Sequence, residues 1–294
     1  MAGFLRRLLG RDRAAGWPTG LIEVGDGVFA YVQAVGGLCV SNAGLIVGPE
    51  GCIVIDALFA PSMTHAFRDE IRRVTDKPVR LLVNTHHHVD HTMGNALFPE
   101  AQIVAHANAR RKQQRVGTAA FDLLRPRIPE LVAETEPVDI RLPDLTFEGA
   151  LTLHAGGREL RLLHFGRAHT IGDTLVLLPQ ERVLFAGDVA FHRVTPLAFE
   201  GHVGDWIGVC DQVDALDVAT IVPGHGPIDG KRGIGALRGY LDLVRTQARQ
   251  GFDEGRDEQA AAASIDLGDY AGWTEPERLP LNVARCYQEF RGEI

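Results

Sequence analysis

The stretch Asn84-Thr85-His86-His87-His88-Val89-Asp90-His91-Thr92-Met93-Gly94-Asn95 holds four histidines and one aspartate within six residues. It follows an apolar run at residues 79–83 that is typical of a buried strand. Because side chains alternate in direction along an extended segment, we expect His86 and His88 to reach one metal ion, while Asp90 and His91 turn toward a second. Imidazole and carboxylate ligands suit zinc, and also iron or manganese. The alternative is an exposed histidine-rich loop that binds metal only adventitiously.

Three further candidate ligands occur singly, each after a strand-like run: His169, Asp188 and His225. Ligands at the ends of strands are what a site in the crevice of an α/β fold requires. Taken alone, each has an ordinary structural explanation, as a surface or core histidine or, for Asp188, as a helix N-cap. Together with the cluster they complete the ligand shells of two metal ions.

The elements around the cluster indicate a mixed α/β fold. Strands are expected at residues 28–34, 42–47 and 51–56, followed by a helix that begins at Pro61-Ser62 and by the strand at 79–83. A strand, a helix and a strand with short connections predict a βαβ unit. The second half repeats this composition with expected strands at 151–154, 159–165, 173–178, 182–186 and 220–222 and an expected helix at 205–216. Two similar halves are compatible with an αββα sandwich, which composition alone does not establish.

Residues 107–141 form the least regular part of the chain. A polar helix is expected at 107–115, followed by several prolines and by the apolar residues Phe121, Leu123 and Leu124. We interpret this segment as an insertion or lid over the site, whose apolar residues would suit an acyl chain. From residue 231 onward the pattern is helical.

Composition limits the class of protein. The 294 residues are 45% hydrophobic and 23% charged, as in a globular protein with a substantial core. The formal net charge of −8 and the scattered basic residues argue against a nucleic-acid partner. No stretch is apolar and long enough for an integral membrane segment.

The cysteines and the N-terminus bear on the compartment. Cys39, Cys52, Cys210 and Cys286 form no CxxC pair, so buried, reduced thiols are expected. Residues 1–10 lack the features of a secretory signal. They are expected to form a solvated extension or a short amphipathic helix. A cytoplasmic protein is therefore expected.

The HxHxDH pattern at His86, His88, Asp90 and His91, followed in order by His169, Asp188 and His225, resembles the metallo-β-lactamase superfamily. The resemblance covers about residues 21–240, flanked by an extension at 1–20 and a helical extension at 241–294 packed on the domain. It implies a four-layer αββα sandwich with two metal ions at one edge. These ions would be two Zn(II), with iron or manganese as the alternatives. It also implies the roles of the ligands: His86, His88 and His169 on one ion, Asp90, His91 and His225 on the other, Asp188 bridging, and Asp56 supporting them.

The type of residue at position 188 differs between branches of the superfamily. Many β-lactamases carry cysteine at this position or lack the bridging carboxylate. Glyoxalase II-like and lactonase-like hydrolases carry aspartate there, and this chain resembles them in that respect. The segments at 84–99 and 169–174 also resemble a bacterial branch with polyketide cyclase/thioesterases. The resemblance therefore implies hydrolysis of a small-molecule thioester, ester or lactone.

Two metal ions would ionise a bridging water for attack on a carbonyl, and Asp90 would orient it and shuttle a proton as the catalytic residue. His87, Arg167 and His192 are weaker candidates for the site, with supporting or solvated roles expected. Two alternatives remain: a β-lactamase, or a persulfide dioxygenase with one iron ion on His86, His169 and Asp188.

Overall fold

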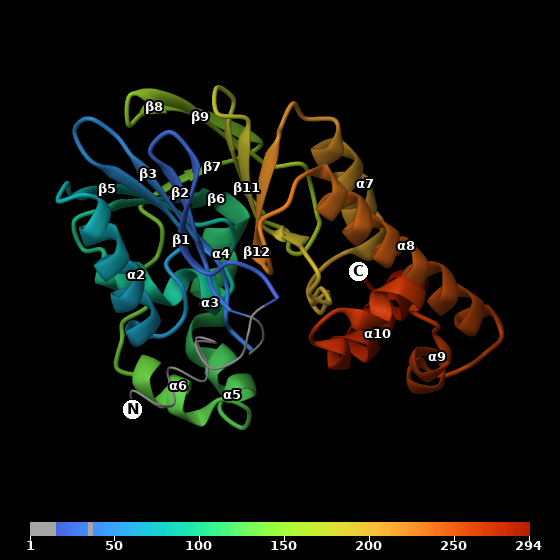
Figure 1. Ribbon diagram of the computed structural model, residues 1–294. Helices are drawn as coiled ribbons and strands as arrows, with labels where there is room; N and C mark the ends of the chain where they lie inside the picture. The colour runs from blue at the N-terminus through green and yellow to red at the C-terminus, as the bar shows by residue number, and fades with distance from the viewer. Residues whose placement is uncertain (1–15, 35–37) are drawn as a thin grey trace.

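The computed structural model describes residues 16–34 and 38–294 of the chain (Figure 1). The expectations for residues 1–10, a solvated extension or an amphipathic helix, lie outside the described residues. The elements below are therefore those of the two described ranges.

Seven strands form the first sheet in their sequence order: β1 (Gly20–Gly25), β2 (Val28–Val32), β3 (Ala43–Val47), β4 (Cys52–Ile55), β5 (Val79–Val83), β6 (Gln102–His106) and β7 (Leu145–Phe147). The pairs from β1 to β4 are antiparallel, and those from β4 to β7 are parallel. The crossover from β4 to β5 runs through α2 (Pro61–Val74), which buries Met63, Phe67 and Ile71. The predicted βαβ unit is confirmed.

Five strands form the second sheet in the order β12, β11, β10, β9, β8, with β8 at Ala150–Ala155, β9 at Arg158–Leu163, β10 at Leu175–Leu178, β11 at Val183–Phe191 and β12 at Thr220–His225. Strands β8 to β11 pair antiparallel, and β12 returns parallel to β11. The two sheets share one buried apolar cluster, in which Ile53 and Val83 of the first sheet pack with Val176 and Phe185 of the second. Burial of both inner faces makes this interface the centre of the molecule.

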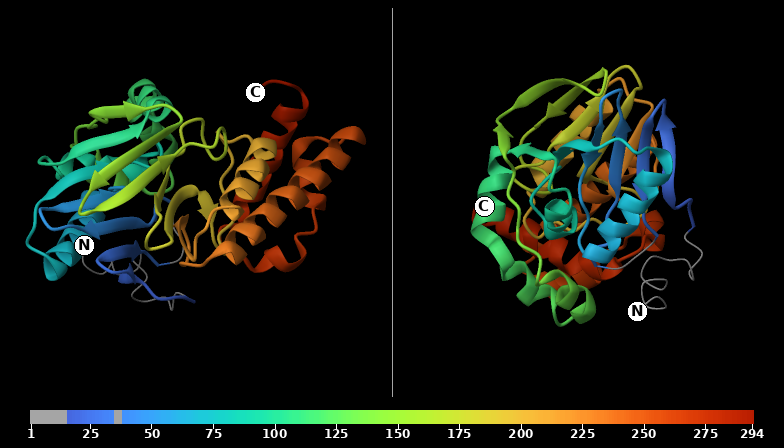
Figure 2. Two further views of the ribbon diagram at one scale, coloured as in Figure 1. Left: turned by 90° about the horizontal axis from the view of Figure 1, so that it is seen from above. Right: turned by 90° about the vertical axis from the view of Figure 1, so that its left-hand side faces the viewer.

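Helices cover the outer face of each sheet. Helix α2 lies on the outside of the first sheet, while α7 (Val203–Asp214) and α8 (Lys231–Asp253) lie along the outside of the second (Figures 1 and 2). The buried residues of α7 and α8 belong to a cluster that includes Leu184 and Ala186 of β11. The layers are therefore helix, sheet, sheet, helix, and the predicted αββα sandwich is confirmed.

Residues 107–141 are more helical than expected and pack differently. They contain α4 (Ala107–Val116), the 3-10 turn η2 (Gly117–Ala119), α5 (Ala120–Leu124) and α6 (Pro129–Thr135). Phe121 and Leu124 are buried in the cluster beneath α2, and the Phe121 ring centroid lies 6.3 Å from that of Phe59. The expectation that these two residues line a lid over the site is wrong, because their side chains pack into the core; only Leu123 is exposed.

The C-terminal part adds α9 (Glu258–Ser264), the 3-10 turns η3 (Gly268–Gly272) and η4 (Pro276–Arg278), and α10 (Leu279–Phe290). The boundary expected between residues 240 and 241 falls inside α8. Val244 of α8 and Val283 of α10 lie in the same apolar cluster as β11. The C-terminal helices therefore share their core with the second sheet.

Two further expectations concern the state of the cysteines and helices that could span a membrane. All four cysteines are buried and free, as predicted. Among the described helices, none combines the length and the apolar character that crossing a bilayer requires.

Candidate metal centre

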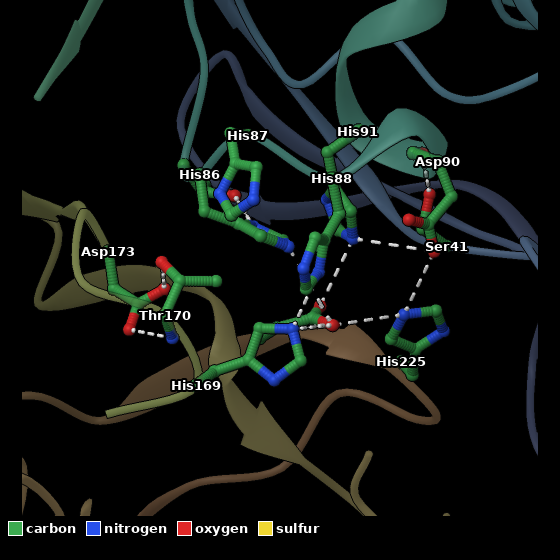
Figure 3. Close-up of polar contacts among 12 residues, drawn as sticks. Ser41, His86, His87, His88, Asp90, His91, His169, Thr170, Asp173 and His225 are labelled. Atoms are coloured by element: carbon green, nitrogen blue, oxygen red, sulfur yellow. Dashed lines mark hydrogen bonds and ion pairs between the residues drawn. The ribbon is translucent and has the colours of Figure 1, made fainter. Parts of the chain in front are cut away.

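The seven predicted ligands come from four separate segments and converge in space (Figure 3). The loop after β5 carries His86 and His88, and the short helix α3 (Val89–Thr92), which leads into η1 (Met93–Leu97), carries Asp90 and His91. The second sheet supplies the remaining three: His169 from the loop after β9, Asp188 from β11 and His225 from the end of β12. The first sheet thus provides four ligands and the second sheet three.

The position of Asp188 differs from the one expected. It was predicted to follow the end of a strand at Ala186, but β11 continues to Phe191. The pairing of β11 with β12 is irregular on both sides of Gly187, which has a φ of 49°. This irregularity re-aims the following side chain, so that Asp188 faces the site from within the strand.

The ligands form two groups that share one carboxylate. Ligand atoms of His86, His88, His169 and Asp188 lie within 4.8 Å of one another, and so do those of Asp90, His91 and His225. Asp188 Oδ2 lies 3.2 Å from His169 Nε2 and 3.3 Å from His225 Nε2. Its Oδ1 lies 3.1 Å from His91 Nε2. Asp188 therefore reaches both groups, which is the placement that a bridging ligand needs.

The hydrogen bonds behind His91 and His225 fix which ring nitrogen faces the centre. His91 Nδ1 lies 2.7 Å from Asp56 Oδ2, and His225 Nδ1 lies 2.9 Å from the carbonyl oxygen of Val40. Both partners only accept, so each Nδ1 carries the hydrogen, and in the neutral ring each Nε2 presents a lone pair. In the neutral rings these lone pairs face the carboxylate oxygens of Asp90 and Asp188, so the contact is stabilised by a bound cation or, without one, by a proton on Nε2.

Buried polar atoms without a hydrogen bond support a metal site. Among the described residues these atoms include His86 Nε2, His91 Nε2 and Asp188 Oδ1. Three such atoms at one place are costly unless something else binds them. The residues present therefore fit two divalent cations. The identity of the metal and the division of ligands between two ions stay predictions.

The electrostatics of the centre follow from burial and the two carboxylates. Burial alone would lower the pKa of His225, but Asp188 and Asp90 outweigh it and raise that pKa to about 9. Burial also opposes the charged form of His91, whose pKa is nevertheless held well above its usual value by Asp188, Asp56 and Asp90. At His169 burial outweighs the same two carboxylates, Asp188 and Asp90, and lowers the pKa to about 3. The centre thus attracts positive charge mainly at the Asp90–His91–His225 group.

Asp56 supports the cluster from the residue after β4, as its resemblance to the superfamily's early aspartate implies. Its Oδ1 accepts from the backbone N–H of Thr85 at 2.8 Å, and its Oδ2 accepts from Thr85 Oγ1 at 2.7 Å. With the His91 contact, this carboxylate binds both ends of the ligand loop. A carboxylate behind a ligating imidazole orients the ring and raises its basicity.

The three weaker candidates lie outside the group of seven. His87 is buried, and its Nε2 lies 2.8 Å from Glu200. His192 contacts the carbonyl oxygen of Pro227 at 3.0 Å and packs against Gly233 of α8, so it is a structural residue. The side chain of Arg167 is half exposed and pairs with Asp205 at 2.8 Å.

Sequence reasoning missed two residues of the loop between β11 and α7. The Phe199 ring stacks on His88 with a centroid distance of 5.1 Å and remains 41% exposed. Glu200 Oε2 lies 3.2 Å from His88 Nε2. Both are more than 100 positions from the cluster in an irregular segment, and no periodicity or spacing marks them.

The chain belongs to the metallo-β-lactamase superfamily: the family's sequence model matches residues 36–225, well over half of the chain. It carries that family's His/Asp cluster at the edge of the αββα sandwich. The class of protein is therefore a member of the metallo-β-lactamase superfamily with the corresponding fold and a candidate metal centre.

Several known proteins are similar to this chain. The α subunit of 2,4-dinitroanisole O-demethylase from Nocardioides sp. (strain JS1661) is 30% identical over 189 residues, which are 61% of this chain and 51% of that protein. The linear primary-alkylsulfatase of Pseudomonas sp. (strain ATCC 19151) is 24% identical over 293 residues, covering 84% of this chain and 55% of that protein. The chain thus spans about half the length of these curated relatives.

A solved structure extends the likeness to the C-terminal helices. The inverting sec-alkylsulfatase Pisa1 from Pseudomonas sp. superposes with a TM-score of 0.70 over 94% of this chain and 51% of its own, at 18% identity. At that identity the likeness shows the fold alone. It nevertheless includes residues beyond the segment that the family model matches.

Proposed function

We propose that this protein is a dinuclear metal-dependent hydrolase of thioesters, esters or lactones. The observation that carries the proposal is the carboxylate of Asp188, whose two oxygens reach both ligand groups within 3.1–3.3 Å. A shared carboxylate between two complete ligand sets is the arrangement that supports hydrolysis by a pair of metal ions.

When bound, the two ions supply Lewis acidity and lower the pKa of a water molecule. The residues of the chain do the rest. Asp188 and the histidines would hold the ions, and the burial of these side chains would keep bulk water away from the ligand atoms. Asp90 is 15% exposed and its Oδ2 lies 3.4 Å from His225 Nε2, so this carboxylate sits at the surface of the centre. It is placed to take a proton from the attacking water and to pass it to the leaving atom.

The exposed ring of Phe199 beside His88 favours a substrate with an apolar group. Phe199 presents an exposed phenyl ring that lies nearly parallel to the His88 imidazole, with an interplanar angle of 18°. An exposed aromatic ring beside a polar centre is a typical contact for an alkyl or aryl substituent. The names of the relatives, an alkylsulfatase and a dinitroanisole O-demethylase subunit, also refer to substrates with apolar groups.

Hydrolysis of an alkyl sulfate ester is the second candidate. It is favoured by the alignment with the linear primary-alkylsulfatase, which covers 84% of this chain. The two candidates differ in the atom attacked. A carboxylic ester or thioester is attacked at its carbonyl carbon, whereas an alkyl sulfate is attacked at sulfur or at the alkyl carbon.

A substrate panel separates the candidates. Protein loaded with zinc, iron or manganese is assayed with an acyl thioester, an aryl ester, a lactone, an alkyl sulfate and a cephalosporin. We expect turnover of the acyl substrates that is lost after chelation and restored by the metal. Faster turnover of the alkyl sulfate would establish the second candidate. Turnover of the cephalosporin alone would establish a β-lactamase.

The role of Asp90 predicts a specific loss. We expect Asp90→Asn to reduce kcat for the best substrate at least about 100-fold, because the amide neither accepts the proton nor carries the charge. Circular dichroism should match that of the parent. The control is Asp205→Asn, which removes an exposed carboxylate paired with Arg167. Parental turnover in Asp90→Asn contradicts the proposed mechanism.

A further inference from the structure

The carboxylate of Glu200 lies beside the metal centre but belongs to neither ligand group of the proposed dinuclear site. Its Oε2 lies 2.8 Å from His87 Nε2 and 3.2 Å from His88 Nε2. Its Oε1 lies 3.2 Å from Lys112 Nζ on α4. The side chain is 24% exposed. One largely buried carboxylate therefore faces three donors, and one of them is a predicted metal ligand.

The contact with His88 decides which nitrogen of that ring faces the centre. A carboxylate only accepts, so the hydrogen of the neutral imidazole resides on Nε2 and the lone pair on Nδ1. His88 Nδ1 lies 2.9 Å from Nε2 of His169, within the group of ligand atoms. Glu200 thus stands behind His88 as Asp56 stands behind His91.

The loop that carries Glu200, residues 195–201, has no regular secondary structure after Thr195. Side chains of η4 and α10 bind its backbone instead. The bonds run from Arg278 Nη1 to Thr195 O (3.0 Å), from Ala198 N to Asn282 Oδ1 (2.8 Å), from Asn282 Nδ2 to Pro196 O (2.9 Å), and from Arg285 to Glu200 O (3.1 Å) and Gly201 O (2.5 Å). Because Arg278 and Asn282 are almost fully buried, the bonds that these two side chains make are shielded from water.

We propose that Glu200 is a positioning residue for the metal ligand His88 and that α10 holds Glu200 in place. The C-terminal helices, which lie beyond residues 36–225 matched by the family model, are then part of the metal centre. The inference rests on the metal centre and not on the substrate proposed above.

His87, His88 and Glu200 also lie close enough to hold a cation of their own. The ammonium of Lys112 argues against a third metal ion, since it lies 3.2 Å from the same carboxylate and supplies the positive charge there. A second cation at this place would be repelled. The cluster is better explained as support for His88.

The test measures metal binding rather than catalysis. Successive zinc equivalents are titrated into metal-free protein against a chelating dye. In Glu200→Gln, which keeps one acceptor oxygen but not the charge, we expect one equivalent to bind about 10- to 100-fold more weakly. The other equivalent should be unchanged, because Asp90, His91 and His225 do not contact Glu200. The matched control is Glu134→Gln, a carboxylate of α6 that binds Ser62 of α2 rather than a histidine of the centre.

Arg285→Met tests the helix without altering the carboxylate. It removes two bonds to the loop while Asn282 and Arg278 remain, so we expect a smaller loss at the same equivalent, about fivefold. Melting of the metal-free variants separates positioning from general destabilisation, since a purely structural role would lower stability and leave zinc affinity intact. Parental affinity of both equivalents in folded Glu200→Gln, or in Arg285→Met, overturns the corresponding half of the proposal.

Discussion

The turn after β4 places two non-glycine residues in the left-handed region beside the metal centre. Asp56 has a φ of 59° and Leu58 a φ of 67°. Such conformations cost about 1 kcal/mol or more each, so the surrounding contacts must stabilise them. The bonds of Asp56 to Thr85 and His91 and the burial of Leu58 provide that stabilisation. Strain at this turn is thus tied to the position of a ligand.

Gly94, three residues after His91, gives a prediction at this scale. A Cβ atom there would lie 2.0 Å from the carbonyl oxygen of Ala57 and 2.3 Å from Thr64 Oγ1. We expect Gly94→Ala to lower the free energy of unfolding by about 2–4 kcal/mol, because buried backbone must move. Denaturant unfolding of the metal-free protein measures this change.

The control for that substitution is Gly235→Ala in α8, where a Cβ would meet no atom within 4 Å. Alanine at this helical position should instead raise stability by about 0.5–1 kcal/mol. Equal effects of the two substitutions would contradict the packing described around η1.

At the scale of elements, the strands and helices with clear periodicity were predictable. Strand β5 has the predicted bounds, and α2 begins at the predicted Pro61. The packing of α5 was not predictable, because an apolar residue in a short helix fits a core and a lid equally well. Burial of Phe121 against Phe59, far away in the sequence, decided between them.

His106, the N-cap of α4, predicts that the stability of the fold depends on pH. Burial lowers the pKa of His106 to about 4, assisted by the neighbouring His164, whose ring stacks on it with a centroid distance of 3.9 Å. The folded state therefore binds this proton less readily than the unfolded state, whose value is near 6.5. This contribution to stability is complete above about pH 6.5 and is lost as the pH falls toward 4, by at most about 3 kcal/mol.

His106→Asn isolates this contribution. His106 also accepts from the N–H of Asn108 as the N-cap of α4, and asparagine can keep that bond. We expect the variant to lose less stability than the parent between pH 6.5 and pH 4.5, as measured by urea unfolding of metal-free protein. His65→Gln, at an exposed histidine of α2, should follow the parental curve. Parallel curves for parent and His106→Asn would exclude His106 as a source of acid lability.

At the scale of the whole molecule, the metal centre joins the two halves of the sandwich. Four of the predicted ligands follow strands of the first sheet and three come from the second, so ions bound there would cross-link the sheets at one edge. Binding to the folded state alone stabilises it by about 4 kcal/mol per site when the free metal is 1,000-fold above Kd. Metal binding should therefore raise the free energy of unfolding of the whole molecule.

We expect chelation to lower Tm by about 10 °C relative to zinc-loaded protein. Differential scanning calorimetry with and without excess zinc measures the shift. His225→Ala, which removes a ligand from the second sheet, should show a clearly smaller shift. Identical melting of loaded and stripped parent protein would mean that the ions do not connect the sheets.

The sequence by itself indicated a mixed α/β fold and seven candidate ligands, because apolar periods mark strands and helices and ligand types recur at strand ends. The αββα sandwich was implied by the resemblance to the metallo-β-lactamase superfamily. Only the tertiary structure decided that Glu200 and Phe199 lie against His88, that α10 holds their loop, and that Phe121 packs into the core. Such contacts join residues up to 112 positions apart and depend on how the layers pack, which local preference does not encode.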